Sequence, residues 1–107
     1  MINRDAKNCI RIIKKCVNEL LPESRLILFG SRARKDNSTS SDYDFLIITK
    51  ELLVMSKKRF LKATLRKKLA TFKIPADILI ESEQELSLKK ELAGHIVRTA
   101  LNEGVAI

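Results

Sequence analysis

The chain has 107 residues, of which 45% are hydrophobic and 32% are charged, and its formal net charge is +8. This length fits a single domain over residues 1–107, and the hydrophobic fraction excludes a disordered chain. Charged residues interrupt every apolar run, which excludes the roughly 18 apolar residues of a membrane-spanning helix. We therefore expect no membrane association.

The first predicted element is a helix over residues 4–20, where apolar residues recur at helical spacing between Asn3, as N-cap, and Pro22. Both cysteines, Cys9 and Cys16, lie in this helix, which would place their Cα atoms about 10.5 Å apart, too far for a disulfide. We therefore expect two core thiols in a reduced, cytoplasmic protein. The first residues lack the apolar core of a secretory signal.

Two strands are predicted next. The apolar run at residues 25–29 predicts a buried strand that ends at Gly30, and residues 43–49 predict a second strand that is rich in β-forming residues. The polar segment 37–42 between them has the composition of a loop.

Residues 56–72 predict a basic helix. Its buried stripe is formed by Leu61, Leu65, Leu69 and Phe72. All charged residues on its other faces are basic: Lys57, Lys58, Arg59, Lys62, Arg66, Lys67 and Lys68. We interpret this run as a solvated face, with binding to nucleic acid or to an acidic partner as the alternative. Residues 1–76 hold 18 basic and 7 acidic side chains, a surplus that indicates a polyanionic partner.

The last part of the chain predicts a third strand at residues 76–80, a helix and a short edge strand at 105–107. Ser82 and Glu85 predict a capping box at the start of this helix, and Gly104 predicts its end. The helix would bury Leu88 or Leu92, Ile96 and Ala100, with His95 on its side. The order of elements predicts an α/β (α+β) protein with a small mixed sheet.

Three aspartates stand at the starts of predicted strands. Asp42 and Asp44 are two residues apart, so both carboxylates project from one face, and a neighbouring strand would bring Asp77 beside them. Three carboxylates at one sheet edge are typical of a two-metal site for phosphoryl or nucleotidyl transfer, with Mg²⁺ as the commonest cation. The alternatives are a solvated turn for the pair and a strand-end residue for Asp77.

A Gly-Ser step, Gly30 and Ser31, follows the first strand and precedes a helical turn. Such a turn exposes backbone N–H groups that hold phosphate, and glycine permits close approach of the backbone. Arg32 and Arg34 in the same turn would add positive charge for a triphosphate. We therefore predict nucleotide binding by these four residues.

These residues together form the pattern Gly-Ser-x10-Asp-x-Asp, and the sequence resembles the minimal nucleotidyltransferase family of the DNA polymerase β-like superfamily. Asp77 and the step Glu103-Gly104-Val105 match further features of that family, so the resemblance covers most of the chain. One departure is Lys35, where relatives usually carry glycine. If this position needs a positive φ, the loop must bend differently here.

The resemblance implies a polymerase β-like palm, in which helices pack on one side of a small mixed sheet. It also implies transfer of AMP from ATP to a hydroxyl, with release of pyrophosphate. Asp42 and Asp44 would hold two Mg²⁺ ions, while Asp77 would complete the acceptor-side metal and help to deprotonate the hydroxyl. Gly30 and Ser31 would bind the β- and γ-phosphates.

The resemblance implies a partner as well, because minimal nucleotidyltransferases are typically paired with a helical HEPN toxin. The chain would then be an antitoxin that adenylylates its partner on a tyrosine. Two alternatives stay open. One is a non-catalytic module that neutralises its partner by binding alone, and the other is a nucleic-acid-binding protein that uses the basic helix at 57–68.

Overall fold

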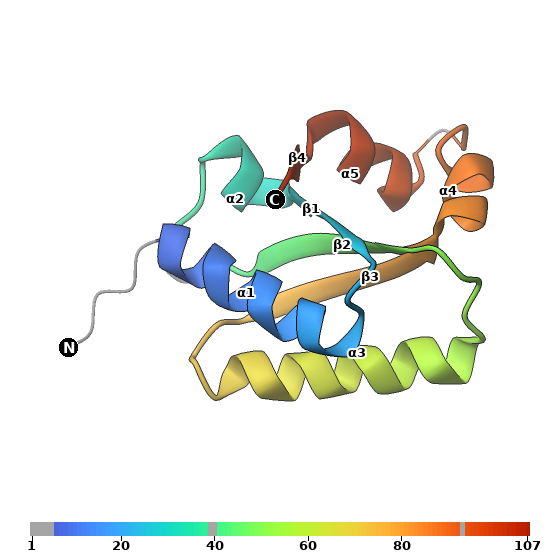
Figure 1. Cartoon of the computed structure of the whole chain (residues 1–107). Helices are drawn as coiled ribbons and strands as arrows, with labels where there is room; N and C mark the ends of the chain where they lie inside the picture. The colour runs from blue at the N-terminus through green and yellow to red at the C-terminus, as the bar shows by residue number, and fades with distance from the viewer. Residues whose placement is uncertain (1–5, 39–40, 93) are drawn as a thin grey trace.

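The computed structural model describes residues 6–38, 41–92 and 94–107 (Figure 1). Four strands form one sheet in the order β3-β2-β1-β4. The strands are β1 (Arg25–Phe29), β2 (Tyr43–Thr49), β3 (Ala76–Ser82) and β4 (Val105–Ala106). β1 is antiparallel to β2 and β4, whereas β2 and β3 are parallel, so the predicted mixed sheet is confirmed. β3 is two residues longer than predicted because its last residues keep pairing with the end of β2.

Two long helices, α1 (Ala6–Leu20) and α3 (Met55–Ala70), lie side by side on one face of the sheet (Figure 1). Their buried side chains are Cys9, Ile13, Cys16 and Val17 from α1, and Leu61, Leu65 and Leu69 from α3. Both cysteines are free and buried, as predicted. The predicted N-cap, Asn3, lies outside the described residues.

Three short helices complete the fold: α2 (Gly30–Arg34), α4 (Glu83–Lys89) and α5 (Ile96–Glu103). α4 and α5 cover the second face of the sheet, and α2 lies beside α5 at the end of β1 (Figure 1). A second core forms there from Phe29, Leu46, Ile48, Leu86, Val97 and Ala100. The expectation that helices pack on only one side of the sheet was therefore wrong.

The predicted last helix is in fact two helices. The capping box of Ser82 and Glu85 begins α4 as predicted, but the helix ends at Lys89. Gly94 then adopts a left-handed conformation with a φ of +75°, and the chain turns before α5. His95 lies at the N-cap of α5, where its Nδ1 accepts the Val97 N–H at 3.1 Å, rather than on the side of a helix.

This break changes which residues of the last helical region are buried. Leu86, Val97 and Ala100 face the sheet, whereas Leu88, Leu92 and Ile96 are exposed. Of the residues predicted to be buried there, only Ala100 is correct. The predicted end of this region holds, because α5 ends immediately before Gly104 and β4 forms the edge of the sheet, although β4 covers Val105–Ala106 and not Ile107.

Two predictions for the basic helix were also wrong. Phe72 lies beyond the end of α3 and is 38% exposed. Lys58 is buried, with its Nζ 2.6 Å from Glu85 Oε2 and 3.9 Å from Glu81 Oε2. Lys89 completes this ion network with Nζ contacts of 2.8 and 2.9 Å to the Glu81 carboxylate. The network joins α3, β3 and α4, so Lys58 is a structural residue.

Within the described part of the chain, no helix combines the length and the hydropathy of a membrane span.

Candidate active site

The three predicted aspartates meet at one end of the sheet. Asp44 is the register partner of Phe29 on β1 and of Asp77 on β3. Register partners on adjacent strands lie about 5 Å apart and project from the same face. Asp42 immediately precedes β2 on the same side of the strand as Asp44, and its charge acts on Asp44, so the three residues lie at the same end of the sheet.

Burial and neighbouring charges raise the pKa of the Asp44 carboxyl group above its ordinary value. Desolvation by burial is the largest cause, and repulsion from Asp77 and Asp42 follows. Arg34 acts in the opposite direction and favours the charged form of Asp44. Repulsion from the two neighbouring aspartates thus adds to the effect of burial, and a bound cation would relieve this repulsion.

The donors at this site fit a hard divalent cation, because carboxylate oxygens are the ligands that Mg²⁺ prefers. Among residues 6–38, 41–92 and 94–107, no three His, Cys, Asp or Glu side chains lie close enough together to form a ready-made ligand set. The argument for a divalent cation therefore depends on the carboxylate oxygens of the aspartates and on the repulsion between Asp44 and the other two aspartates.

Gly30 joins the end of β1 to α2 directly above Asp44. Its φ is +73°, in the left-handed region that favours glycine. A Cβ at this position would collide with the Asp44 carboxylate. Both the backbone conformation and the close approach of Asp44 thus require glycine, which links the Gly-Ser step physically to the aspartates.

The predicted phosphate donors of this turn are not equally available. The Gly30 N–H donates to Glu103 Oε1 at 2.9 Å, so Gly30 contributes space for Asp44 rather than a donor for phosphate. Ser31 is the second residue of α2, and its N–H is one of the four that an α-helix leaves without an intrahelical partner. Ser31 is therefore the better candidate donor.

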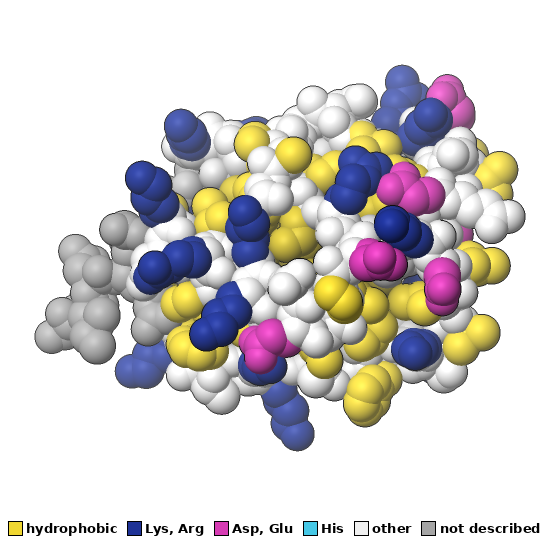
Figure 2. Space-filling view, viewed as in Figure 1, with side chains coloured by type: hydrophobic (Ala, Val, Ile, Leu, Met, Phe, Trp, Pro, Cys, Tyr) yellow, Lys and Arg dark blue, Asp and Glu magenta, His cyan; other side chains and the backbone are white. Residues whose placement is uncertain are grey.

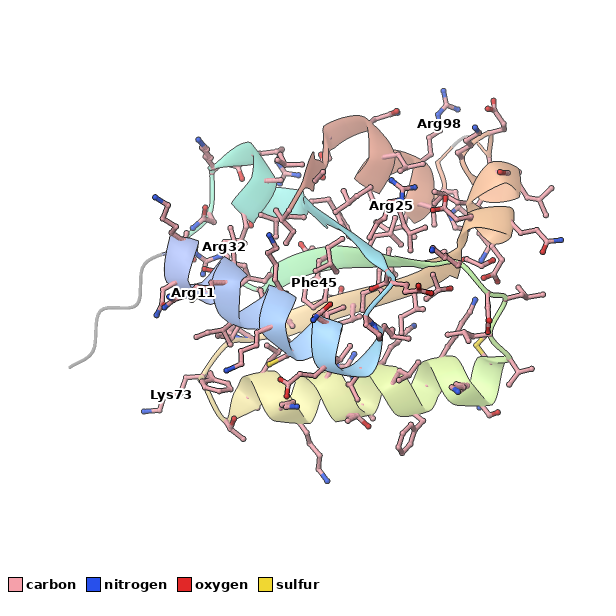
Figure 3. All side chains as sticks on the ribbon, in the orientation of Figure 1. Arg11, Arg25, Arg32, Phe45, Lys73 and Arg98 are labelled. Carbon is pink, nitrogen blue, oxygen red and sulfur yellow. The ribbon has the colours of Figure 1, made fainter. Side chains whose placement is uncertain are left out.

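The two arginines of α2 make different contacts. Arg32, labelled in Figure 3, donates through Nε and Nη2 to the Ser41 carbonyl at 3.2 and 2.9 Å. Its guanidinium also lies 4.1 Å from the centroid of the Tyr43 ring. Arg32 therefore anchors the segment that leads into β2, and its predicted contact with a nucleotide stays a prediction.

Arg34 is exposed and interacts with two carboxylates. Its Nε donates to Asp36 at 3.1 Å, and its Nη1 lies 3.2 Å from both oxygens of Glu103. In the sequence, Glu103 stands out only as part of a family pattern, and no role was predicted for it. Because it contacts Gly30 across 73 positions of the chain, no local pattern indicated this contact.

Residues 10–107 match the family of nucleotidyltransferase domains. The chain belongs to this family. A relative from Methanocaldococcus jannaschii, named "Putative protein adenylyltransferase MJ0141", is 32% identical over 101 residues, which cover 92% of this nucleotidyltransferase and 94% of the relative.

Solved structures share the fold of this nucleotidyltransferase. A chain from a crystal structure of a toxin–antitoxin with AMP-PNP has a TM-score of 0.65 at 18% identity, over 95% of this chain and 72% of that chain. A chain from a structure of a tri-AMPylated Shewanella oneidensis HEPN toxin in complex with MNT antitoxin has a TM-score of 0.57 at 16% identity, over 94% and 69%. The predicted polymerase β-like fold is confirmed.

Lys35 of the nucleotidyltransferase is the residue at which the family resemblance led us to expect glycine. It adopts φ +64° and ψ +28° at the end of α2. The loop therefore does not have to bend differently, contrary to what was expected, because Lys35 itself adopts the left-handed conformation. This conformation costs a lysine about 1 kcal/mol of strain.

We expect Gly30→Ala to destabilise the nucleotidyltransferase by about 2 kcal/mol or more, because it adds left-handed strain and displaces the Asp44 carboxylate. Denaturant unfolding measures this loss. Gly94→Ala is the matched control, since Gly94 has a φ of +75° but open space around the added Cβ. Equal destabilisation by the two substitutions would contradict a role for the contact with Asp44.

Proposed function

We propose that this nucleotidyltransferase transfers AMP from ATP to a tyrosine of a helical HEPN toxin and acts as its antitoxin. The observation that carries the proposal is the position of Asp44, which lies beside Asp77 and directly against Gly30 of the Gly-Ser step. A relative named as a protein adenylyltransferase and the toxin–antitoxin structures with the same fold support it.

Asp42 and Asp44 would hold Mg²⁺, and Asp77 would complete the ligands of a second ion on the acceptor side. Bound Mg²⁺ would supply positive charge that stabilises the negative charge developing on the phosphate oxygens in the transition state. The same charge would offset the repulsion from Asp77 and Asp42, which, after burial, contributes to the raised pKa of Asp44.

The residues of the chain orient the reactants. The Ser31 N–H and hydroxyl would hold the terminal phosphates of ATP at the start of α2, with Arg34 adding positive charge. Asp77, which is exposed on edge strand β3, would accept the proton of the tyrosine hydroxyl. The hydroxyl oxygen then bonds to the α-phosphorus, the bond to the bridging oxygen breaks, and pyrophosphate leaves.

The surface charge is consistent with an acidic partner. Figure 2 shows basic side chains gathered over the end of the molecule where α1 begins, which is also the end that holds α2 in Figure 1. The basic face of α3 is smaller than predicted, because Lys58 is buried and Lys68 lies 3.5 Å from Glu19. An acidic partner would therefore be attracted to the end that carries the aspartates and the Gly-Ser step.

The test of this proposal is a labelling experiment with the product of the neighbouring gene, which we expect to be a HEPN protein. Incubation of both proteins with ATP labelled on its α-phosphate and with Mg²⁺ should label the neighbour on tyrosine, and Asp42→Asn should prevent this. Label on RNA instead, with the neighbour unmodified, would favour the nucleic-acid alternative. Tight binding of the neighbour without any labelling would favour the non-catalytic module.

Asp77→Asn should separate catalysis from nucleotide binding. Because Asp77 serves the acceptor hydroxyl, we expect its loss to leave the affinity for Mg–ATP near that of the wild type and to slow transfer by about a hundredfold or more. Calorimetric titration and a rate assay check the two quantities. A parallel fall of affinity and rate would instead place Asp77 among the residues that hold the triphosphate.

A further inference from the structure

Glu103 connects the C-terminal segment to the Gly-Ser step. Its Oε1 accepts the Gly30 N–H at 2.9 Å, and both of its carboxylate oxygens lie 3.2 Å from Arg34 Nη1. The Glu103 side chain is 25% exposed, against 48% for Arg34, so the carboxylate is the better shielded partner. One side chain thus contacts both the first and the last residue of α2.

The chain places Glu103 by a close contact of the backbone. Glu103 ends α5, and a Cβ on the next residue, Gly104, would collide with the Ala100 carbonyl oxygen and the Ile27 side chain. Glycine therefore lets the chain pass tightly over β1, after which Val105 pairs with Leu28. This pairing fixes Glu103 next to the end of β1, where α2 begins.

The start of α2 depends on this contact. α2 has five residues, and its N-cap, Phe29, has no side chain that can accept a hydrogen bond from the first turn. A helix of this length has no stability of its own, because nucleation is unfavourable. Glu103 supplies the missing acceptor from another element, in a charge-assisted hydrogen bond.

We propose that Glu103 is a positioning residue of the nucleotide site, which fixes the orientation of the Gly30–Ser31 turn and of the Arg34 guanidinium. This inference rests on the proposed function in one respect, namely that Ser31 and Arg34 contact the triphosphate. The negative charge of Glu103 opposes triphosphate binding, so its contribution is geometric. A neutral side chain that still accepts the Gly30 N–H should therefore replace it.

Because the role of Glu103 is geometric, two substitutions of this residue should give different results. Glu103→Ala removes the acceptor and should weaken Mg–ATP binding by about tenfold or more, with a matching rise in KM for ATP. Glu103→Gln keeps a carbonyl oxygen at the Gly30 N–H and should stay within about threefold of the wild type. If glutamine restores the affinity, the effect of Glu103 comes from accepting the Gly30 N–H and not from its negative charge.

The experiment is a calorimetric titration of each variant with Mg–ATP, alongside thermal unfolding without ligand. Glu83→Ala is the matched control, because Glu83 also accepts two hydrogen bonds from an arginine, Arg25, at 3.0 Å each but lies on α4. It should leave the affinity for Mg–ATP unchanged. If Glu103→Ala does not fold, Glu103→Asp, which is one methylene shorter, replaces it in the comparison.

The outcomes separate the positioning role from the proposed function. Wild-type affinity in Glu103→Ala, or an equal loss of affinity in Glu103→Ala and Glu103→Gln, would overturn the positioning role while the proposed function stands. A wild-type chain that binds no Mg–ATP would overturn the proposed function and this inference together. Weakened binding in Glu103→Ala, with rescue in Glu103→Gln, would support both.

Discussion

Asp44→Asn is expected to abolish nucleotidyl transfer and, at the same time, to stabilise the ligand-free protein at neutral pH. The gain in stability follows from the raised pKa of Asp44, which lies above its ordinary value of 3.8 because of burial and of repulsion from Asp77 and Asp42. The folded state therefore binds the proton more tightly than the unfolded state does. Asparagine removes this charge and its repulsion.

The sign of the pH dependence follows from this difference in proton binding. The free energy of unfolding of the wild type should fall as pH rises from the ordinary pKa of an aspartate through the raised pKa of Asp44. Asp44→Asn should lack this fall, so its advantage should be largest at neutral pH and should vanish in acid. Thermal unfolding of both proteins across this range measures the difference.

The same substitution should remove the response to ligand. Mg–ATP should bind only the native wild-type protein and raise its melting temperature, whereas Asp44→Asn should show no such shift. Transfer should fall by on the order of a thousandfold, because the stabilisation of transition-state charge is lost. Glu51→Gln is the control, because Glu51 is an exposed carboxylate beyond the other end of β2. It should change neither the shift in melting temperature nor the rate of transfer. An unchanged shift in Asp44→Asn would contradict the assignment of the site.

Lys58→Met should produce the largest loss of stability, about 3 kcal/mol, with a fall in melting temperature of roughly 10 °C or more. The substitution leaves the carboxylates of Glu85 and Glu81, which contact Lys58 in a buried network, without this partner. Lys57→Met is the matched control, because Lys57 precedes Lys58 on α3 but is exposed. Equal unfolding midpoints in urea for the two variants would contradict the role of Lys58.

The network also has a pH signature. Burial alone would raise the pKa of Glu85, but hydrogen bonds from Lys58 and Ser82 outweigh it and lower the pKa. The network therefore contributes stability above the ordinary pKa of a glutamate, and this stability is lost as pH falls through the lowered pKa. The difference between Lys58→Met and the wild type should accordingly narrow in acid.

The parts of the fold that could be predicted are those determined by neighbouring residues. β1 and β2 begin and end as predicted because each is an apolar run with a clear boundary, Gly30 after one and a polar loop before the other. The capping box at Ser82 is equally local. The break between α4 and α5 was missed because apolar residues recur at helical spacing through this region, although α4 ends at Lys89 and Gly94 adopts a left-handed φ before α5 begins.

The parts that could not be predicted depend on contacts between distant residues. Lys58 looked like one of several solvated cations, and its partner Glu85 lies 27 positions away on another element. Glu103 reaches Gly30 across 73 positions. For Asp44 and Asp77, in contrast, the strand pattern was sufficient, because each is the second residue of a predicted strand and the parallel pairing of these strands places them side by side.

The most direct test of the account compares two labels on ATP in the presence of Mg²⁺ and the proposed HEPN partner. Transfer of AMP predicts that label on the α-phosphate appears on the partner protein, that label on the γ-phosphate leaves in pyrophosphate, and that Asp44→Asn prevents both. Appearance of the γ-label on the partner would instead show phosphoryl transfer. That result would contradict the assignment of the aspartates and the Gly-Ser step to a nucleotidyl transfer site.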